Sequence, residues 1–141
     1  MITLSQIHSE EIKSHGREAF PEECCGAMLG VVDTEGGKIT KKIVRIENTM
    51  SENRHRRFSI TPDDYRQLES LAKSENLTLL GFYHTHPDHP AQPSQTDLSF
   101  AWPFFSYIIL SVLKGNPDIM NSFELDLDTE KFKDESIAIR E

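Results

Sequence analysis

Three side chains that commonly bind metal ions lie between positions 84 and 97. His84 and His86 are two residues apart, and on an extended backbone this spacing directs both imidazole rings to the same face. Asp97 follows Pro87 and the proline-rich stretch 90–93, which can turn the chain back toward the histidines. Two imidazoles and one carboxylate suit a zinc ion that keeps a fourth coordination position open for water. The pattern therefore predicts a catalytic zinc site.

Each part of this pattern also has an explanation that involves no metal. Histidines on solvated loops are common, so a His-x-His pair by itself is weak evidence for two ligands. Ser94, followed three residues later by Asp97, is a variant of the helix capping box, and Pro93 directly before it fits a helix start. The two interpretations of Asp97 are compatible, because a capped first turn would fix the direction of its carboxylate.

The complete pattern resembles the signature of the JAMM, or MPN+, metallopeptidases. Each defining position of that family's His-Ser/Thr-His-x7-Ser-x2-Asp is matched by His84-Thr85-His86, Ser94 and Asp97. Upstream, Pro21-Glu22-Glu23-Cys24-Cys25-Gly26 resembles the family's Pro-x-Glu-x-Cys-Gly segment. The resemblance covers most of the chain. It implies a single JAMM/MPN+ domain over residues 1–141, of the α/β class, with a mixed β-sheet flanked by helices and an architecture similar to that of cytidine deaminases.

The resemblance also implies a role for each of these side chains. His84, His86 and Asp97 would hold one Zn²⁺ per chain, and Glu23 would be the general base. Glu22 competes for that role, but in an extended segment Glu23 shares a face with the cysteine two residues later, as in the family's segment. Cys24 and Cys25 are expected to be buried strand residues, because neighbouring strand positions point in opposite directions and cannot both reach one metal.

The implied chemistry is hydrolysis of a peptide or isopeptide bond. A zinc ion at this site would lower the pKa of a bound water to about 7. Glu23 would accept a proton from that water and pass it to the leaving amine, while the Ser94 hydroxyl would donate a hydrogen bond to the oxyanion. The substrate implied by the resemblance is the C-terminal tail of a ubiquitin-like or sulfur-carrier protein, which could bind as an added strand at a sheet edge.

Two other function classes were weighed. A non-catalytic MPN scaffold resembles the same fold but typically lacks metal-site residues, whereas this sequence contains the complete set. A zinc deaminase would need a His-x-Glu pair and a later Pro-Cys-x-x-Cys, and neither is present. The metallopeptidase is therefore favoured, with the scaffold as the alternative.

Length and composition limit the partners and the compartment. A chain of 141 residues predicts one domain, and a net charge of -8 argues against nucleic acid. The apolar stretches are too short to span a bilayer, and the amino terminus lacks a secretory signal, so a cytoplasmic enzyme without a membrane partner is expected. Arg54, Arg56 and Arg57 form a small basic cluster, which is either a solvated loop or an aid to encounter with an acidic partner. The oligomeric state is not predicted.

Hydrophobic periodicity predicts helices and strands that interleave along the chain. Helices are expected over 4–20, with Ser5 as a possible N-cap, over 61–76, with Thr61 as N-cap and Pro62 in the first turn, and over 94–102. The strand before the metal motif is expected to end at Tyr83. The expected strands are 24–32, 38–49, 58–60, 77–83, 105–113, 123–127 and 137–140.

Overall fold

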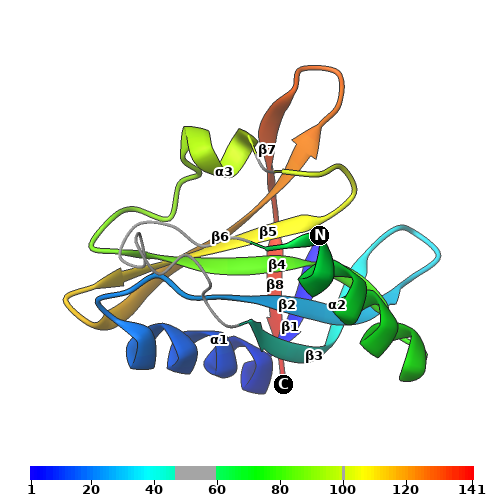
Figure 1. The fold of residues 1–141 in the computed structure, drawn as a ribbon, viewed down its shortest axis with the longest axis horizontal. Helices are drawn as coiled ribbons and strands as arrows, with labels where there is room; N and C mark the ends of the chain where they lie inside the picture. The colour runs from blue at the N-terminus through cyan, green and yellow to red at the C-terminus, as the bar shows by residue number, and fades with distance from the viewer. Residues whose placement is uncertain (47–59, 100) are drawn as a thin grey trace.

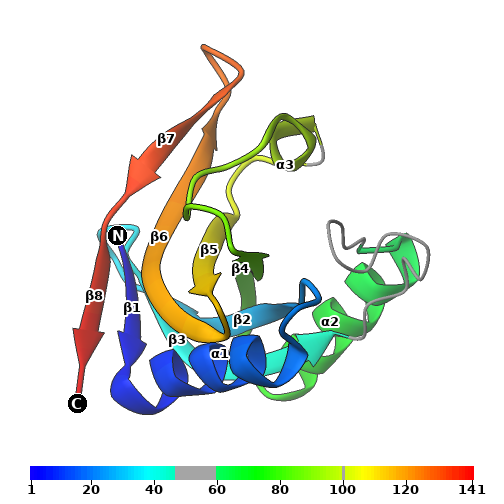
Figure 2. The same ribbon diagram turned by 90° about the vertical axis from the view of Figure 1, so that its left-hand side faces the viewer.

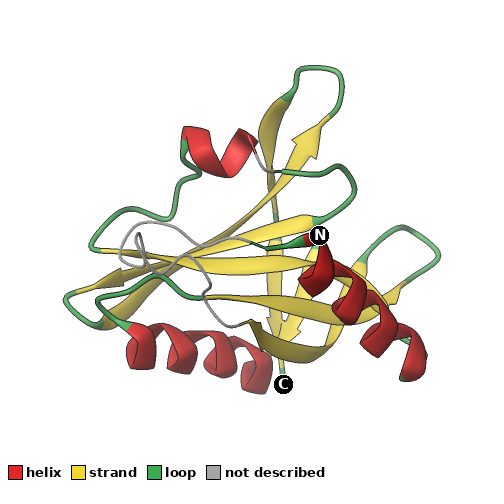
Figure 3. Cartoon of the chain, viewed as in Figure 1, coloured by secondary structure: helices red, strands yellow, loops and turns green. Residues whose placement is uncertain are grey.

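The computed structural model, which describes residues 1–46, 60–99 and 101–141, is built on one curved sheet with helices packed against it (Figures 1 and 3). Its elements are β1 (Ile2–Ser5), α1 (Gln6–Ala19), β2 (Cys25–Val32), β3 (Lys38–Ile46), α2 (Pro62–Ser74), β4 (Thr78–Pro87), α3 (Gln95–Ser99), β5 (Ser106–Leu113), β6 (Asn116–Asp126), β7 (Lys131–Glu135) and β8 (Ile137–Arg140). The strand order is β7-β6-β5-β4-β2-β3-β1-β8. The β4–β5, β1–β3 and β1–β8 pairs are parallel and the other pairs are antiparallel. The predicted α/β class, a mixed sheet flanked by helices, is confirmed.

The two outer strands of the sheet are consecutive pieces of the chain. β7 pairs with β6, β8 pairs with β1, and the Ile2 amide donates to the carbonyl of Ser136, which lies between them, at 3.0 Å. Figure 2 shows β7 and β8 following one another along one side of the molecule. One continuous segment of the chain therefore forms both ends of the strand order. The sheet must curve strongly to bring these two ends together.

The helices α1 and α2 cover opposite faces of the sheet. Leu80 and Tyr83 of β4 pack in the core on the α1 side, whereas Leu79 and Phe82 pack with Leu68 of α2, because the register shift between β2 and β4 interrupts the alternation between positions 79 and 81. The alternation continues past Phe82 and directs positions 84 and 86 to the α2 side. The two histidines thus lie on a face set by the core packing of their own strand.

Both long helices have the N-cap residues that the sequence predicts. The Ser5 hydroxyl accepts from the amide of His8 at 3.0 Å. Thr61 and Asp64 form a reciprocal capping box with both bonds at 3.0 Å, and Pro62 occupies the first turn. These caps form between residues three apart, so local sequence is sufficient to predict them.

Several predicted boundaries are wrong. Residues 2–5 form strand β1 instead of the start of the first helix, β4 continues beyond Tyr83 to Pro87, and α3 is shorter than predicted. β6 begins at Asn116, earlier than the predicted strand 123–127, and β7 was not predicted. Strand pairing, which local periodicity does not record, sets the strand boundaries: β1 pairs with β3 and β8, the end of β4 pairs with β5, and the β5–β6 and β6–β7 hairpins define β6 and β7. The basic cluster at Arg54, Arg56 and Arg57, and all but the last residue of the predicted strand 58–60, lie outside the described residues.

No helix in the described ranges combines the length and the apolar character needed to cross a membrane.

A glycine in β2 permits close packing against the strand that carries the histidines. Gly26 lies opposite Tyr83, and a Cβ atom there would overlap the tyrosine ring. That ring is fully buried, and its hydroxyl lies 2.6 Å from Nδ1 of His15 on α1, so it has no space into which to move. We expect Gly26→Ala to reduce the free energy of unfolding by about 1–3 kcal/mol or more, as overpacking does, measured by chemical denaturation.

Gly16→Ala is the matched control. Its Cβ would lie 3.1 Å from side-chain methyl groups of Leu110 and Val112, which can shift slightly. Alanine is also favoured over glycine inside a helix by about 1 kcal/mol, so the net change should be small. Equal stability of the Gly26→Ala and wild-type proteins would contradict the proposed steric reason for glycine at position 26.

Candidate metal centre

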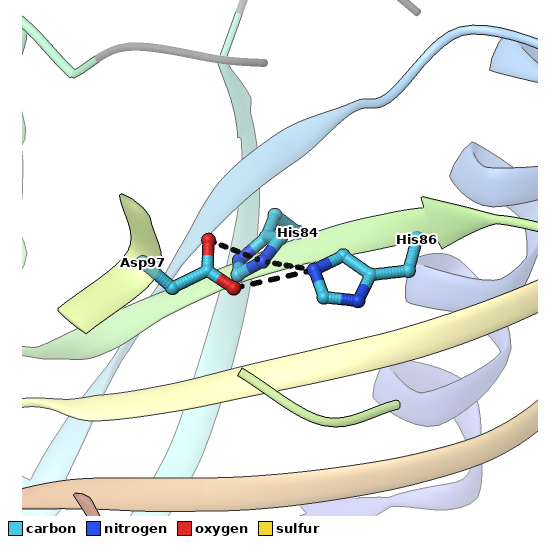
Figure 4. A group of neighbouring side chains, drawn as sticks. All are labelled: His84, His86 and Asp97. Carbon is cyan, nitrogen blue, oxygen red and sulfur yellow. Dashed lines mark hydrogen bonds and ion pairs between the residues drawn. The ribbon is translucent and has the colours of Figure 1, made fainter. Parts of the chain in front are cut away.

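The side chains of His84, His86 and Asp97 converge on one point, as Figure 4 shows. The Nε2 atoms of the two histidines are 3.1 Å apart. Asp97 Oδ1 lies 3.2 Å from His84 Nε2, and Asp97 Oδ2 lies 3.3 Å from His86 Nε2. All three candidate ligand atoms lie within 4.8 Å of one another. The convergence expected from the sequence spacing is therefore present.

The strand β4 holds the two histidines rigidly. It is paired with β2 on one side and β5 on the other, and Cys25 lies opposite His84 in the β2 ladder. Thr85, between the histidines, points to the opposite face, where its hydroxyl accepts from the Cys24 amide at 3.0 Å. His84 is almost entirely buried, with 3% of its side chain exposed. The imidazoles therefore project from a strand fixed along both edges.

Asp97 is oriented by the first turn of α3. Its amide donates to Ser94 Oγ at 3.0 Å, and its Oδ2 accepts from the Ser94 amide at 2.8 Å. These two bonds form the reciprocal capping box that the spacing of Ser94 and Asp97 predicts. The same carboxylate faces both histidines, so the capping interpretation and the ligand geometry hold together.

The pKa shifts of Asp97 and His84 favour the forms that bind a metal ion, whereas that of His86 favours its charged form. Although burial acts to raise the pKa of Asp97, hydrogen bonds with His84 and His86 hold it well below its usual range. Burial lowers the pKa of His84, which favours the neutral imidazole. For His86, burial acts to lower the pKa, but Asp97 and the Pro90 carbonyl raise it overall. An ionised carboxylate and a neutral imidazole are the forms that bind zinc.

This donor set fits zinc better than it fits calcium or magnesium. Zinc takes imidazole nitrogen and carboxylate oxygen in a tetrahedral arrangement, whereas the harder cations prefer oxygen ligands alone. Within the described part of the chain, His84, His86 and Asp97 form the only group of three or more such side chains close enough to hold a metal.

The start of β2 places Glu23 beside the metal-binding motif. Cys25 lies opposite His84, and the Thr85 amide donates to the Cys24 carbonyl at 3.0 Å, so continuing this antiparallel register sets Glu23 opposite His86. Burial raises the pKa of Glu23 to about 7, with the His86 charge lowering it and the Asp97 charge raising it. A carboxyl group with a pKa near neutrality suits a general base. Glu22, the competing carboxylate, is less buried.

Both cysteines are buried, as expected, but only Cys25 belongs to strand β2, and Cys24 directly precedes it. Both are free thiols, and Cys25 packs in the core on the α2 side with Ala27 and Phe82. The hydroxyl of Thr85 lies against the Cys24 sulfur at 3.7 Å, and burial raises the pKa of Cys24 to about 11. Burial also raises the pKa of Cys25. Neither environment favours a reactive thiolate.

Sequence reasoning missed one contact at the site. His86 Nδ1 lies 2.9 Å from the Pro90 carbonyl oxygen, a contact that orients the ring from behind. The acceptor is a backbone atom of a loop, so residue type carries no signal for it. Only the general rule that a metal-binding histidine uses its second nitrogen in a hydrogen bond suggests searching for such a partner.

Known proteins are similar to this chain in sequence and in fold. Residues 5–126 match the family model described as prokaryotic homologs of the JAB domain. The desampylase of Haloferax volcanii is 30% identical over 115 residues, which cover 78% of this chain and 80% of that protein. A solution structure of a Desulfitobacterium hafniense protein aligns with a TM-score of 0.86 at 29% identity, covering 100% of this chain and 94% of the other. A JAB1/MPN domain protein from Archaeoglobus fulgidus has the same fold, with a TM-score of 0.64 at 16% identity over 100% of both chains.

The donor set leads to a prediction about metal content. We expect the purified protein to carry about one zinc ion per chain and His86→Ala to lose it, because two remaining ligands cannot hold a structural or catalytic zinc tightly. His89→Ala is the control, since His89 is an exposed loop histidine outside the converging group. Elemental analysis after extensive dialysis measures both. Undiminished zinc in His86→Ala would rule out this ligand assignment.

Proposed function

We propose that this chain is a single-domain zinc-dependent isopeptidase that cleaves at the C-terminal tail of a ubiquitin-like protein. The chain belongs to the family of prokaryotic homologs of the JAB domain, and the proposal proceeds from that membership. The observation that carries this proposal is the convergence of His84, His86 and Asp97 on the face where the register places Glu23. Three metal ligands and a separate carboxylate with a pKa near 7 are the groups that metal-assisted hydrolysis of an amide requires.

The proton transfers are assigned to Glu23. When zinc is bound by His84, His86 and Asp97, it supplies Lewis acidity that makes a nearby water more acidic and polarises the scissile carbonyl. The Glu23 carboxylate accepts a proton from the attacking water, and its raised pKa lets it retain that proton until the amine leaves. The protonated carboxyl then donates to the departing nitrogen, which restores the carboxylate.

Ser94 is assigned the role of hydrogen-bond donor to the oxyanion. Its hydroxyl oxygen accepts from the Asp97 amide, and that bond does not use the hydroxyl hydrogen. The hydrogen can therefore be donated to the oxygen that gains charge when the carbonyl becomes tetrahedral. Ser94 is exposed, so substrate can reach it. A serine at this position can act as both helix cap and hydrogen-bond donor.

The substrate class is inferred from the similar proteins. The Haloferax volcanii relative is a desampylase, which supports a ubiquitin-like modifier as the partner of this chain and an isopeptide bond as the target. A linear peptide bond after the tail of a sulfur-carrier protein is the related possibility within the same chemistry. Both substrates present a flexible carboxyl-terminal segment whose last carbonyl is attacked, so they require the same catalytic groups.

Replacement of Glu23 separates catalysis from metal binding. Glu23→Gln preserves the size of the side chain but cannot accept the proton of the water, so we expect the rate of hydrolysis to fall by ~10²-fold or more while zinc remains bound. The rate is measured on a ubiquitin-like protein conjugated to lysine, or fused through its tail to a second protein. Chelation should abolish wild-type cleavage and added zinc should restore it.

Glu22→Gln is the matched control, since it makes the same chemical change one residue earlier. We expect it to retain nearly full activity and zinc content. An inactive Glu22→Gln, or an active Glu23→Gln, would show that the base was assigned to the wrong carboxylate. Cleavage that survives complete removal of zinc would contradict the proposed reaction class.

A further inference from the structure

The loop between β4 and α3 supplies the carbonyl that orients His86. Nδ1 of His86 lies 2.9 Å from the Pro90 oxygen. A carbonyl oxygen only accepts hydrogen bonds, so in the neutral ring Nδ1 carries the hydrogen and the lone pair of Nε2 faces His84 and Asp97. This is the tautomer that binds a metal through Nε2. The position of the Pro90 carbonyl therefore influences how well His86 can bind zinc.

Packing alone does not hold this loop in place. Asp88, His89 and Pro90 are exposed, and exposed loops are mobile unless specific contacts fix them. A pocket of about 270 Å³ lies against the loop, lined in part by Ser111 of β5 and Asn121 of β6. Ala91 packs in a buried cluster with Ile109 and Phe123, so the exposed residues before it are the part of the loop that depends on hydrogen bonds to keep its shape.

Two side chains from the sheet bind the carbonyls on either side of Pro90. Ser111 Oγ donates to the His89 oxygen at 2.6 Å, and Asn121 Nδ2 donates to the Ala91 oxygen at 3.0 Å. Only 2% of Ser111 is exposed, so water competes poorly for its hydrogen bond. The carbonyls of residues 89, 90 and 91 are thus all hydrogen-bonded, the middle one by the candidate ligand itself.

An irregularity in the β5–β6 pairing lies beside the residue that binds the loop. The β5–β6 register shifts between Leu110 and Val112, at the position of Ser111. Shifts of this kind redirect side chains and release backbone groups from the ladder, often next to functional sites. On the other side of β5, the Asp88 amide continues the β4–β5 pairing by donating to the Val112 carbonyl at 2.7 Å, and Asp88 Oδ1 accepts from the Lys114 amide at 2.7 Å. The start of the loop is therefore fixed to the same hairpin as its centre.

We propose that Ser111 and Asn121 are positioning residues for His86. By holding the carbonyls of His89 and Ala91 they fix the Pro90 carbonyl, and through it the orientation of the His86 ring toward zinc. The inference rests on the zinc site of the proposed function. Ser111 and Asn121 lie on strands that carry none of the candidate ligands. The inference therefore extends the group of residues that determine zinc affinity beyond β4 and α3.

Threonine and valine at position 111 give a matched test. The two side chains have nearly the same shape and both suit a strand, but only threonine keeps the hydroxyl. We expect Ser111→Thr to retain zinc affinity close to wild type, Ser111→Val to bind zinc more weakly, and Ser111→Val with Asn121→Leu to lose about 10- to 100-fold. Zinc affinity is measured by competition with a chelator of known affinity. The visible absorption of the cobalt-substituted protein reports ligand geometry independently of activity.

Ser122→Val is the control for a purely structural effect. Ser122 neighbours Asn121 on β6, points to the opposite face and donates to Glu135 Oε1 at 2.7 Å in a buried position. Its loss should reduce the free energy of unfolding of the metal-free protein without changing zinc affinity or the cobalt spectrum.

The outcomes separate the two proposals. If Ser111→Val and Asn121→Leu behave like Ser122→Val, with unchanged zinc affinity and cobalt spectrum, the positioning role is overturned and the zinc site stands. Equal zinc affinities for Ser111→Thr and Ser111→Val would likewise overturn the role of the Ser111 hydroxyl. A wild-type protein that binds no zinc would overturn the proposed function together with this inference.

Discussion

The pairing of β4 on both of its edges is the constraint on which the site depends. Ladders with β2 and β5 fix the strand, so the two-residue spacing of His84 and His86 becomes a fixed separation of two imidazoles on one face. The β2 ladder also places Glu23, because the register that sets Cys25 opposite His84 sets Glu23 opposite His86. A register slip of one residue would move the glutamate to the other face. The candidate ligands and the candidate base are therefore positioned by one set of backbone hydrogen bonds.

The two carboxyl groups of the site are driven to different protonation states by their surroundings. Asp97 accepts hydrogen bonds from two imidazoles, which hold its pKa well below its usual range despite burial. Glu23 is buried, and burial raises its pKa to about 7. One group remains an anion suited to binding a cation, while the other can take up and release a proton near neutrality. Burial and hydrogen bonding, more than residue type, thus distinguish the candidate ligand Asp97 from the candidate base Glu23.

The features that the sequence predicts correctly are those fixed by neighbours a few residues away. The caps at Ser5 and Thr61, and the capping box of Ser94 and Asp97, involve residues three positions apart. The family signature identified the converging trio before any fold was known. The errors lie where strand pairing, which periodicity does not record, sets the boundaries: β5 extends β4, and the β5–β6 and β6–β7 hairpins define the start of β6 and the whole of β7. Ser111 and Asn121 were missed because each contacts a loop at least 20 residues earlier.

The topology also restricts how the tail of the proposed substrate would approach the candidate metal centre. A tail that adds as a strand needs a free edge, and in the described part of the sheet such edges are the outermost strands β7 and β8 and the part of β3 beyond Ile39, which β1 does not pair. β5 and β6 separate β7 from β4, and β2, β3 and β1 separate β8 from it. A strand added at either end would therefore lie several strand spacings, each about 4.8 Å, from the histidines. The described strands offer no ladder position beside His84 and His86. A tail that reaches them must cross the face of the sheet, where side chains and loop backbone, rather than a strand edge, would bind it.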